Sequence, residues 1–419
     1  MKSKETTQSK NIILLIIGQI ISLFGNQILR FALPLYLLNQ TGSSALFGTI
    51  SAVSFIPMIL LFPIGGAIAD RFNKRNIMVI LDFSTSVLII LFSILMHSFS
   101  IVVLIAIMLI LLFAIQGAYQ PAVKASIPLL VSREHLMRAN SVVDVVNSLS
   151  AMLGPVIGGL LLAVFSLTPI LYISAVCFFA SAVMEIFIHI PFERREIQGD
   201  IIKVGFHDIA GSFRFIFKKE TIVWKMSIVY GLFTMLLTSL FVIALPVLLT
   251  QRLGFSMDTA NRLYGYAQGA IAVGSIIGGI LAGVLSKKLK PTYMPYMMVA
   301  AALCTLLSGI VLQAVNSSMA IYIVLALGCS ILMIISSTLQ IQMMSYIQMM
   351  TPVEMIGKVI SAVICVCMCS VPIGQLLFGI AFEHIGNSVY ILFYLAAVIV
   401  IVISILTRSL YSNVSRRVV

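Results

Sequence analysis

Charged residues are scarce in this chain: Asp, Glu, Lys and Arg make up 10% of its 419 residues, whereas 60% are hydrophobic. A soluble domain usually has about a quarter of its residues charged. The composition therefore excludes an ordinary soluble globular protein. Three enzyme signatures are also missing, namely GxxxxGKS/T, HExxH and GxSxG. We therefore expect no phosphate-binding loop, no enzyme activity and no cofactor.

Residues that form disulfides or bind metals are few. All six cysteines fall within long apolar runs, which argues against an extracellular disulfide framework. The segment Cys365-x-Cys-x-Cys369 resembles a copper-binding motif, but on a helix only Cys365 and Cys369 share a face. Small cysteines that pack between helices are the simpler interpretation. The five histidines are scattered, so we expect no metal site.

Acidic residues are fewer than basic ones, 14 against 26, which gives a formal net charge of +12. With the N-terminus placed in the cytoplasm, nearly all basic residues fall on the cytoplasmic side. Only Arg252 and Arg262 fall in an outward loop. Such an asymmetry is the positive-inside bias of membrane proteins. The charge therefore predicts topology, with both termini in the cytoplasm, and it does not indicate nucleic-acid binding.

Long apolar runs are abundant. A bilayer-spanning helix needs about 20 consecutive apolar residues, and the chain has twelve such runs. They lie at approximately 12–38, 45–69, 76–97, 99–121, 140–165, 168–190, 222–250, 262–286, 292–313, 318–342, 356–382 and 386–408. The first run is too long for a signal-peptide core and no small-residue cleavage site follows it, so we interpret it as a retained helix. The expected fold class is an all-α membrane protein.

The twelve runs form two sets of six. The longest polar stretch, 191–220, separates them, and we interpret it as a cytoplasmic linker between six-helix bundles at 1–190 and 221–419. Three features of the first half recur in order in the second, at offsets of 212, 213 and 220 positions. These are Leu33-Pro34 with Gly42 and Leu245-Pro246 with Gly254, the charged loops after Gly66 and Gly279, and Gly154 with Gly159 and Gly374 with Gly379. Parallel six-helix repeats are typical of a large class of secondary transporters.

The loop after the second run, Gly66-Ala-Ile-Ala-Asp70-Arg71-Phe-Asn-Lys74-Arg75, places one carboxylate and three cations between two apolar helices. It resembles the signature loop of the major facilitator superfamily, and the resemblance covers essentially the whole chain. Gly154-Pro155-Val-Ile-Gly158-Gly159 is similar to the motif of that family's exporters. Phe31-Ala-Leu-Pro-Leu-Tyr36, Thr41-Gly42-Ser43 and Arg138-Ala139-Asn140-Ser141 resemble its macrolide-efflux and siderophore-exporter branch.

The resemblance implies two six-helix bundles around a central cavity that opens alternately to each side. It also implies that Asp70 touches the positive N-terminal end of the eleventh helix and holds the inner faces together. The alternative is a solvated charge cluster that serves topology alone. Asn73 replaces the family's usual glycine, and asparagine tolerates left-handed backbone angles. The gating candidates are Gly66, Asp70, Arg71, Arg75, Arg138, Gly154, Pro155, Gly158 and Gly159.

Arg30 is the sharpest ionisable candidate inside a predicted helix. It falls in the outer part of the first helix. There it either meets an anionic group on the substrate, pairs with Asp258 or Glu383 in an outer gate, or extends to the outer headgroups.

Three carboxylates, Asp82, Asp144 and Glu185, fall within about 10 Å of the predicted inner surface. Asp82 and Asp144 are expected to pair with basic residues on that side. The expected partners are Arg71, Arg75 and Arg138. Glu185 has no basic partner in its own helix, which leaves a proton-titrating role more open.

No Asp or Glu lies near the middle of any predicted helix, and Asn26 stands where relatives often have an acid. This argues against a pump selective for cationic drugs and favours neutral, amphipathic or anionic substrates. A polar side chain within a helix is, however, equally often a bridge between helices. The candidates for the substrate or proton pathway are Asn26, Gln27, Arg30, Asp82, Gln116, Asp144, Asn147, Glu185, Gln268 and Gln340.

The sequence thus predicts a secondary active transporter in a bacterial cytoplasmic membrane. It is expected to export a small amphipathic compound, either an antimicrobial or an endogenous metabolite such as a siderophore, by proton antiport. We expect a monomer whose partners are the substrate, the lipid bilayer and protons as the coupling ion. The alternatives are an importer or uniporter, a lipid transporter, and a membrane sensor that does not transport.

Overall fold

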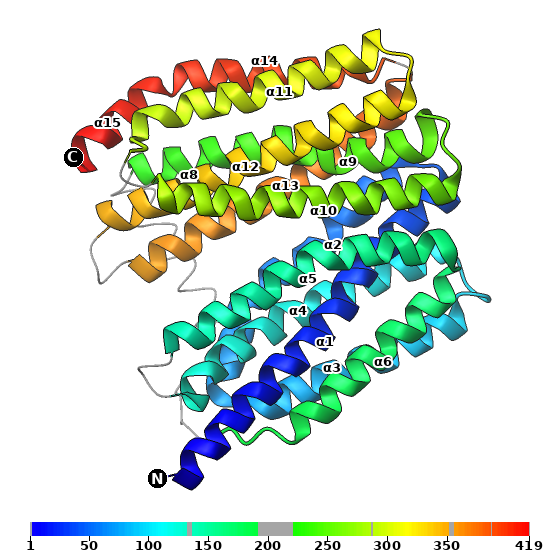
Figure 1. Ribbon diagram of the computed structural model, residues 1–419, viewed down its shortest axis with the longest axis vertical. Helices are drawn as coiled ribbons and strands as arrows, with labels where there is room; N and C mark the ends of the chain where they lie inside the picture. The colour runs from blue at the N-terminus through cyan, green and yellow to red at the C-terminus, as the bar shows by residue number, and fades with distance from the viewer. Residues whose placement is uncertain are drawn as a thin grey trace. The chain divides into compact units, whose positions relative to one another are not determined.

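The computed structural model describes residues 2–131, 136–191, 221–285, 288–351, 356–386 and 388–418, and within these ranges all regular structure is helical (Figure 1). The first half holds α1 (Lys2–Thr41), α2 (Ser44–Arg71), α3 (Lys74–Leu95), α4 (Ile101–Leu130), α5 (Leu136–Val164) and α6 (Leu167–Ile186). The second half holds α8 (Thr221–Phe233), η2 (Thr234–Thr238), α9 (Ser239–Val247), η3 (Leu248–Arg252), α10 (Met257–Val284), η4 (Pro291–Tyr293), α11 (Met294–Ala314), α12 (Ser318–Met350), α13 (Ile356–His384), α14 (Tyr390–Leu406) and α15 (Arg408–Val418).

Eleven helices in the described ranges are long and apolar enough to cross a membrane, and the number is twelve if α14 and α15, which meet at a bend of 42°, are counted as one span. Each of the twelve runs expected from the sequence overlaps one of them. The all-α membrane fold is therefore confirmed. Helices are the expected outcome because a segment inside a bilayer must satisfy its backbone hydrogen bonds internally.

The chain divides into two compact units. Unit 1 comprises residues 1–40 and 53–206, and unit 2 comprises residues 41–52 and 207–419. The first turns of α2 therefore belong to unit 2 and the rest of that helix to unit 1. The division into bundles at 1–190 and 221–419 stays a prediction, and the linker between them falls almost entirely outside the described residues. Within unit 1, α3 packs beside α6, and within unit 2, α11 packs beside α14 (Figure 1).

Glycines that match between the halves make matching helix contacts. In unit 1, a Cβ at Gly154 of α5 would overlap the side chain of Gln27 on α1. In unit 2, a Cβ at Gly374 of α13 would overlap Ser239 at the start of α9. Ser239 lies 212 positions after Gln27, which is the offset of the first sequence match. Small residues allow this close approach of membrane helices in both units.

The ends of the first and seventh membrane helices also correspond. Gly42 follows α1 with a φ of 64°, and Gly254 lies just beyond η3 with a φ of 69°. Both glycines adopt the left-handed backbone conformation that terminates helices and that other residues rarely tolerate. The two halves therefore share a local backbone device at positions that are 212 residues apart.

Candidate functional site

Arg30 lies on α1 against two aromatic rings of unit 1. Its guanidinium carbon is 3.7 Å from the ring centre of Phe113 on α4 and 5.9 Å from that of Phe55 on α2. The two rings contact each other, with centres 4.4 Å apart. A cation over aromatic faces is stabilised electrostatically, more so where water is excluded. The arrangement fixes a positive charge on a membrane helix by aromatic contacts.

One helical turn from Arg30, two of the predicted polar residues bond to each other. Asn26 Nδ2 donates a hydrogen bond of 2.6 Å to Gln116 Oε1, which joins α1 to α4. Asn26 Oδ1 is buried without a hydrogen-bond partner. Gln27, the next residue on α1, packs under Gly154 of α5. Asn26, Gln116 and Arg30 therefore form one polar stretch between α1 and α4, and we refer to them together as the arginine site.

The other polar residues predicted for the pathway either form hydrogen bonds within their own helix or are exposed. Asn147 donates 3.0 Å to the backbone oxygen of Val143 in its own helix. Gln268 donates 3.0 Å to the hydroxyl of Tyr264, also in its own helix. Gln340 on α12 is exposed. Asn147 and Gln268 thus have local partners.

A second polar group lies deeper in unit 1 and comprises Gln19, Ser22, Asp82, Tyr119 and Glu185; we call it the acid cluster. Gln19 Nε2 donates 2.5 Å to the Tyr119 hydroxyl, which in turn donates 2.6 Å to Glu185 Oε1. Ser22 Oγ donates 3.1 Å to Asp82 Oδ1. Four helices, α1, α3, α4 and α6, each contribute at least one member. The cluster brings two carboxyl groups together within the helix bundle.

The expected pairing of Asp82 with Arg71 or Arg75 is wrong. Asp82 is 1% exposed, and its described hydrogen bond is the one from Ser22. Asp82 Oδ2 has no hydrogen-bond partner. The reason is its position along α3. Asp82 lies two turns from Arg75, which is near the start of the helix, and its side chain is buried against α1, where Ser22 bonds to it.

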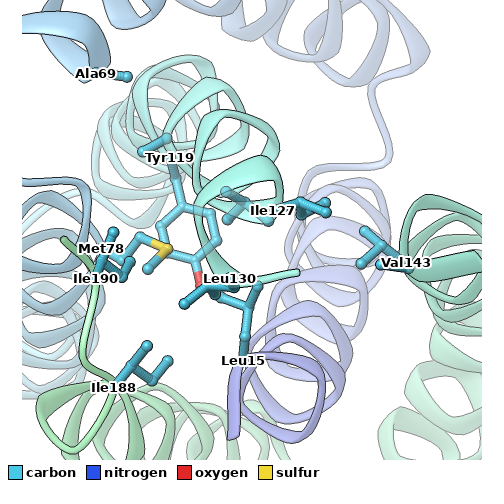
Figure 2. Close-up of a cluster of buried hydrophobic side chains, with 12 residues drawn as sticks. Leu15, Ala69, Met78, Tyr119, Ile127, Leu130, Val143, Ile188 and Ile190 are labelled. Carbon is cyan, nitrogen blue, oxygen red and sulfur yellow. The ribbon is translucent and has the colours of Figure 1, made fainter. Parts of the chain in front are cut away.

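Figure 2 shows an apolar cluster of unit 1 that includes Leu15, Met78, Tyr119 and Ile188. Leu15 precedes Gln19 by one turn of α1, Met78 precedes Asp82 by one turn of α3, and Ile188 follows Glu185 just beyond α6. All three side chains are fully buried. In Figure 2 the Tyr119 ring lies among these apolar side chains, so Tyr119 belongs to both clusters. The residue one turn from each of Gln19, Asp82 and Glu185 on the side of the helix end is therefore apolar and buried.

The signature loop is described only in part. Asn73 is the N-cap of α3, with a φ of −64°, and its side chain accepts a hydrogen bond of 3.1 Å from the Arg75 backbone N–H. The backbone at Asn73 is therefore not left-handed, and the tolerance of asparagine for such angles is not used; asparagine serves here as a helix cap. Arg71 ends α2, and a Cβ at Gly66 would meet open space. The side chains of Asp70, Arg138 and Asp144 lie outside the described residues, so the gating role stays a prediction.

The exporter-type motif in α5 acts in helix packing. Gly154 and Gly158 face α1, where Cβ atoms would meet Gln27 and Phe31 respectively. Pro155 lies within the helix, where it removes one backbone donor. Whether the motif bears on the direction of transport stays a prediction.

Glu383, considered as a partner of Arg30, has other contacts within unit 2. Its Oε2 accepts hydrogen bonds from Ser43 Oγ at 3.2 Å, from Ser44 Oγ at 3.1 Å and from the Ala45 backbone N–H at 3.1 Å. A carboxylate in this position is stabilised by the positive end of α2. Next to it, Gly48 of α2 and Gly379 of α13 are in backbone contact. Glu383 thus fixes the start of α2 to the end of α13.

Sequence reasoning missed Gln19, Ser22 and Tyr119. A signal was present, since Gln19, Ser22 and Asn26 recur at helical spacing and mark one polar face of α1. Tyr119 similarly follows Gln116 by three positions on α4. The sequence did not show that these two faces meet, because their contacts join positions 90 and 100 residues apart.

Comparison with known proteins agrees with this architecture. The family model of the Major Facilitator Superfamily matches residues 15–372. The uncharacterized MFS-type transporter YfiS of Bacillus subtilis is 28% identical over 180 residues, 43% of this chain and 42% of that protein. Macrolide efflux protein A of Streptococcus pyogenes is 26% identical over 175 residues, 42% and 43% of the two chains. The staphyloferrin A transporter of Staphylococcus aureus is 24% identical over 170 residues, 39% and 42%. The aligned region thus spans less than half the length of these relatives.

Solved structures share the fold over nearly the whole chain. A bacterial homolog of the human lysosomal transporter Spinster, inward-facing and unoccupied, has a TM-score of 0.71 at 13% identity and covers 98% of this chain and 97% of its own. A D-xylose-proton symporter has a TM-score of 0.65 at 12% identity, with coverage of 94% and 96%. At such identities the likeness shows the fold alone.

Proposed function

Because this chain belongs to the Major Facilitator Superfamily, we propose that it is a secondary transporter that exports a small amphipathic compound from the cytoplasm in exchange for protons. The substrate carries an anionic or strongly polar group beside an apolar body. An endogenous metabolite of the siderophore kind and an antimicrobial of the macrolide kind both fit this description.

The observation that carries the proposal is the environment of Arg30. The side chain lies over Phe113 and Phe55, with the Asn26–Gln116 pair one turn away. Among the described residues of unit 1, no carboxylate bonds to it. An arginine on a membrane helix without such a partner is costly to maintain. A bound anionic group would supply the missing charge, and the rings would accept its apolar part.

Export, as opposed to uptake, is supported by the relatives. One of the aligned proteins is a macrolide efflux protein, and another is the staphyloferrin A transporter. The Gly154-Pro155 segment adds to this support through its similarity to the motif of the family's exporters. Uptake is the alternative, since a D-xylose-proton symporter shares the fold.

Proton exchange is proposed because the sequence contains no phosphate-binding loop, which leaves an ion gradient or the substrate gradient to drive transport. The acid cluster supports the choice of protons, since it buries two carboxyl groups, each of which has one oxygen without a hydrogen-bond partner. The proposal thus assigns the binding of the coupling proton to the acid cluster of unit 1.

The proposal is tested by expressing the chain in a bacterium that lacks its own efflux pumps. Growth is compared in the presence of erythromycin, cationic dyes, fatty acids and a citrate-type siderophore. Accumulation of radiolabelled erythromycin and siderophore is then measured with and without a protonophore. Cells with an empty vector and cells that express Asp70→Asn at equal membrane levels are the controls.

Export predicts lower accumulation than in vector cells and loss of the difference when the protonophore is added. Higher accumulation than in vector cells would replace export with uptake. A cationic dye exported more strongly than the siderophore would contradict the substrate class, because Arg30 disfavours a second positive charge.

A further inference from the structure

We propose that the acid cluster is the proton-binding site of this transporter, with Asp82 and Glu185 as the two groups that take up protons. The inference rests on the proposed function in one respect: it names the place where the exchanged protons bind. Three properties of the cluster support this proposal: its unpaired hydrogen-bond acceptors, the burial of its carboxyl groups and the positions of the charged residues around it.

The hydrogen bonds of the cluster leave more acceptors than donors. Tyr119 satisfies one oxygen of Glu185 and Ser22 one oxygen of Asp82. Three further oxygens are buried and have no hydrogen-bond partner, namely Gln19 Oε1, Asp82 Oδ2 and Glu185 Oε2. A buried acceptor without a donor is costly. Protons on the two carboxyl groups would turn two of these acceptors into donors, and Gln19 Oε1 is an acceptor in the same cluster.

The burial of the two carboxyl groups points the same way. Glu185 is 0% exposed and Asp82 is 1% exposed. Two negative charges at such a site repel each other and lose their hydration, which costs far more than one hydrogen bond supplies. Glu185 is also the penultimate residue of α6, where the helix dipole is negative. Protonation removes all three penalties at once.

The surrounding charged groups do not compensate the cluster. On α3 the nearest basic residues, Lys74 and Arg75, begin the helix, two turns or more from Asp82. On α4 Lys124 is exposed, and after α6 His189 is exposed while its backbone bonds to Asn11. On α5 the side chains of Arg138 and Asp144 lie outside the described residues. The hydrogen bonds to the two carboxyl groups come from Ser22 and Tyr119, not from any of these basic side chains.

The apolar cluster explains how proton access is controlled. Leu15, Met78 and Ile188 lie three or four residues nearer the helix ends than Gln19, Asp82 and Glu185, and their side chains are fully buried (Figure 2). The two carboxyl groups are buried as well, and we infer that their protons stay bound in this conformation. A shift of these helices that admits water would allow the protons to leave, since water solvates the carboxylates that remain. Proton release is thus coupled to a change in packing.

The first test measures the protons directly and needs no substrate. The full-length protein is reconstituted in lipid, and its infrared spectrum is recorded as the pH is raised from acidic to alkaline. A carbonyl band of protonated carboxyl groups is expected to persist at neutral pH. Asp82→Asn or Glu185→Gln should each remove part of it, and the double variant should remove it. Asp258→Asn, which neutralises an exposed carboxylate on α10, should leave it unchanged.

A spectrum without that band at neutral pH, or a band that survives in the double variant, would overturn the proposal whatever the protein transports. The variants replace oxygen by nitrogen at equal size, and equal unfolding temperatures are checked first. If a variant fails to fold, the persistence of the band in the unmodified protein still decides whether buried protonated carboxyl groups exist.

The second test separates proton coupling from substrate binding. Proteoliposomes loaded with erythromycin or the siderophore, whichever the unmodified protein transports, are assayed for exchange and for pH-driven net transport. The double variant is expected to retain exchange and to lose net transport. Net transport that still follows the pH gradient would overturn the assignment. Failure of the unmodified protein on both probes would count against the proposed function, while the infrared result would stand.

Discussion

At the scale of single residues, Arg30 illustrates how an aromatic environment can hold a charge in a membrane helix. Its neighbours Phe55 and Phe113 supply quadrupole attraction without neutralising it. We propose that this charge binds an anionic group of the substrate. This distinguishes Arg30 from Glu383, which is engaged by three donors at the start of α2.

Replacement of Arg30 by glutamine should weaken transport of an anionic substrate about tenfold or more, since a charge-assisted hydrogen bond is worth about 1.5–3 kcal/mol. Transport of a neutral substrate should change little. The measurement is the apparent KM of each substrate in proteoliposomes. Arg30→Lys keeps the charge and is the matched control. Equal losses for both substrates would assign Arg30 a structural role.

Tyr119 is the residue that joins Gln19 to Glu185. Tyr119→Phe should lower the free energy of unfolding by about 1–3 kcal/mol, because the Glu185 and Gln19 groups lose their buried partner. The midpoint of thermal unfolding in detergent measures this loss. Tyr266→Phe, at a half-exposed position on α10, is the control. An unchanged midpoint would show that the hydroxyl contributes nothing to the cluster.

At the scale of elements, close helix contacts are set by glycines at matching positions. Gly65 of α2 meets the backbone of Gly117 and Ala118 on α4, and Gly278 of α10 meets Ile334 on α12. Gly65 and Gly278 are 213 positions apart, the offset of the charged loops. The repeat expected from sequence is thus visible as the same kind of helix crossing in each unit.

Gly374→Ala should destabilise unit 2 by about 1–3 kcal/mol, since the added Cβ overlaps the backbone oxygen of Met235 and the side chain of Ser239. Gly283→Ala is the matched control, because a Cβ there meets open space. That substitution should be neutral or stabilising by about 0.5–1 kcal/mol. Thermal unfolding of both variants in detergent checks the pair, and similar midpoints would contradict the packing argument.

At the scale of the whole molecule, the chain is a multi-pass membrane protein of the Major Facilitator Superfamily. Alternating access remains our proposal, and the charged loop that contains Asp70 is its gating candidate. Since that side chain lies outside the described residues, the argument for gating rests on the sequence pattern and on the two-state principle that a contact made in one state biases the equilibrium.

Asp70→Asn should leave the protein in the membrane at normal levels and reduce export about fivefold or more, as expected when a contact worth about 1 kcal/mol or more is lost from one state. Export of radiolabelled substrate from cells, normalised to membrane level, is the measurement. Lys288→Gln, in the degraded second copy of the loop, is the control. Full export by Asp70→Asn would remove the gating argument.

The sequence by itself determined the all-α membrane fold and the places of the long apolar helices. Hydropathy suffices for this because a bilayer imposes length and internal hydrogen bonding on every crossing segment. The positions of Gly42 and Gly254 likewise follow from local backbone requirements, which sequence matching can detect. Asn73 shows the limit of such local reasoning, since its helix-capping bond was not anticipated.

Only the tertiary structure decided which polar groups meet. Asp82 was assigned to arginines that are near in sequence, but its hydrogen-bond partner is Ser22, 60 positions away. Gln19, Tyr119 and Glu185 come together across separations of 100 and 66 positions. The face that each helix turns toward its neighbours depends on packing across the whole bundle, and in a uniformly apolar helix the hydropathy pattern carries little information about that face.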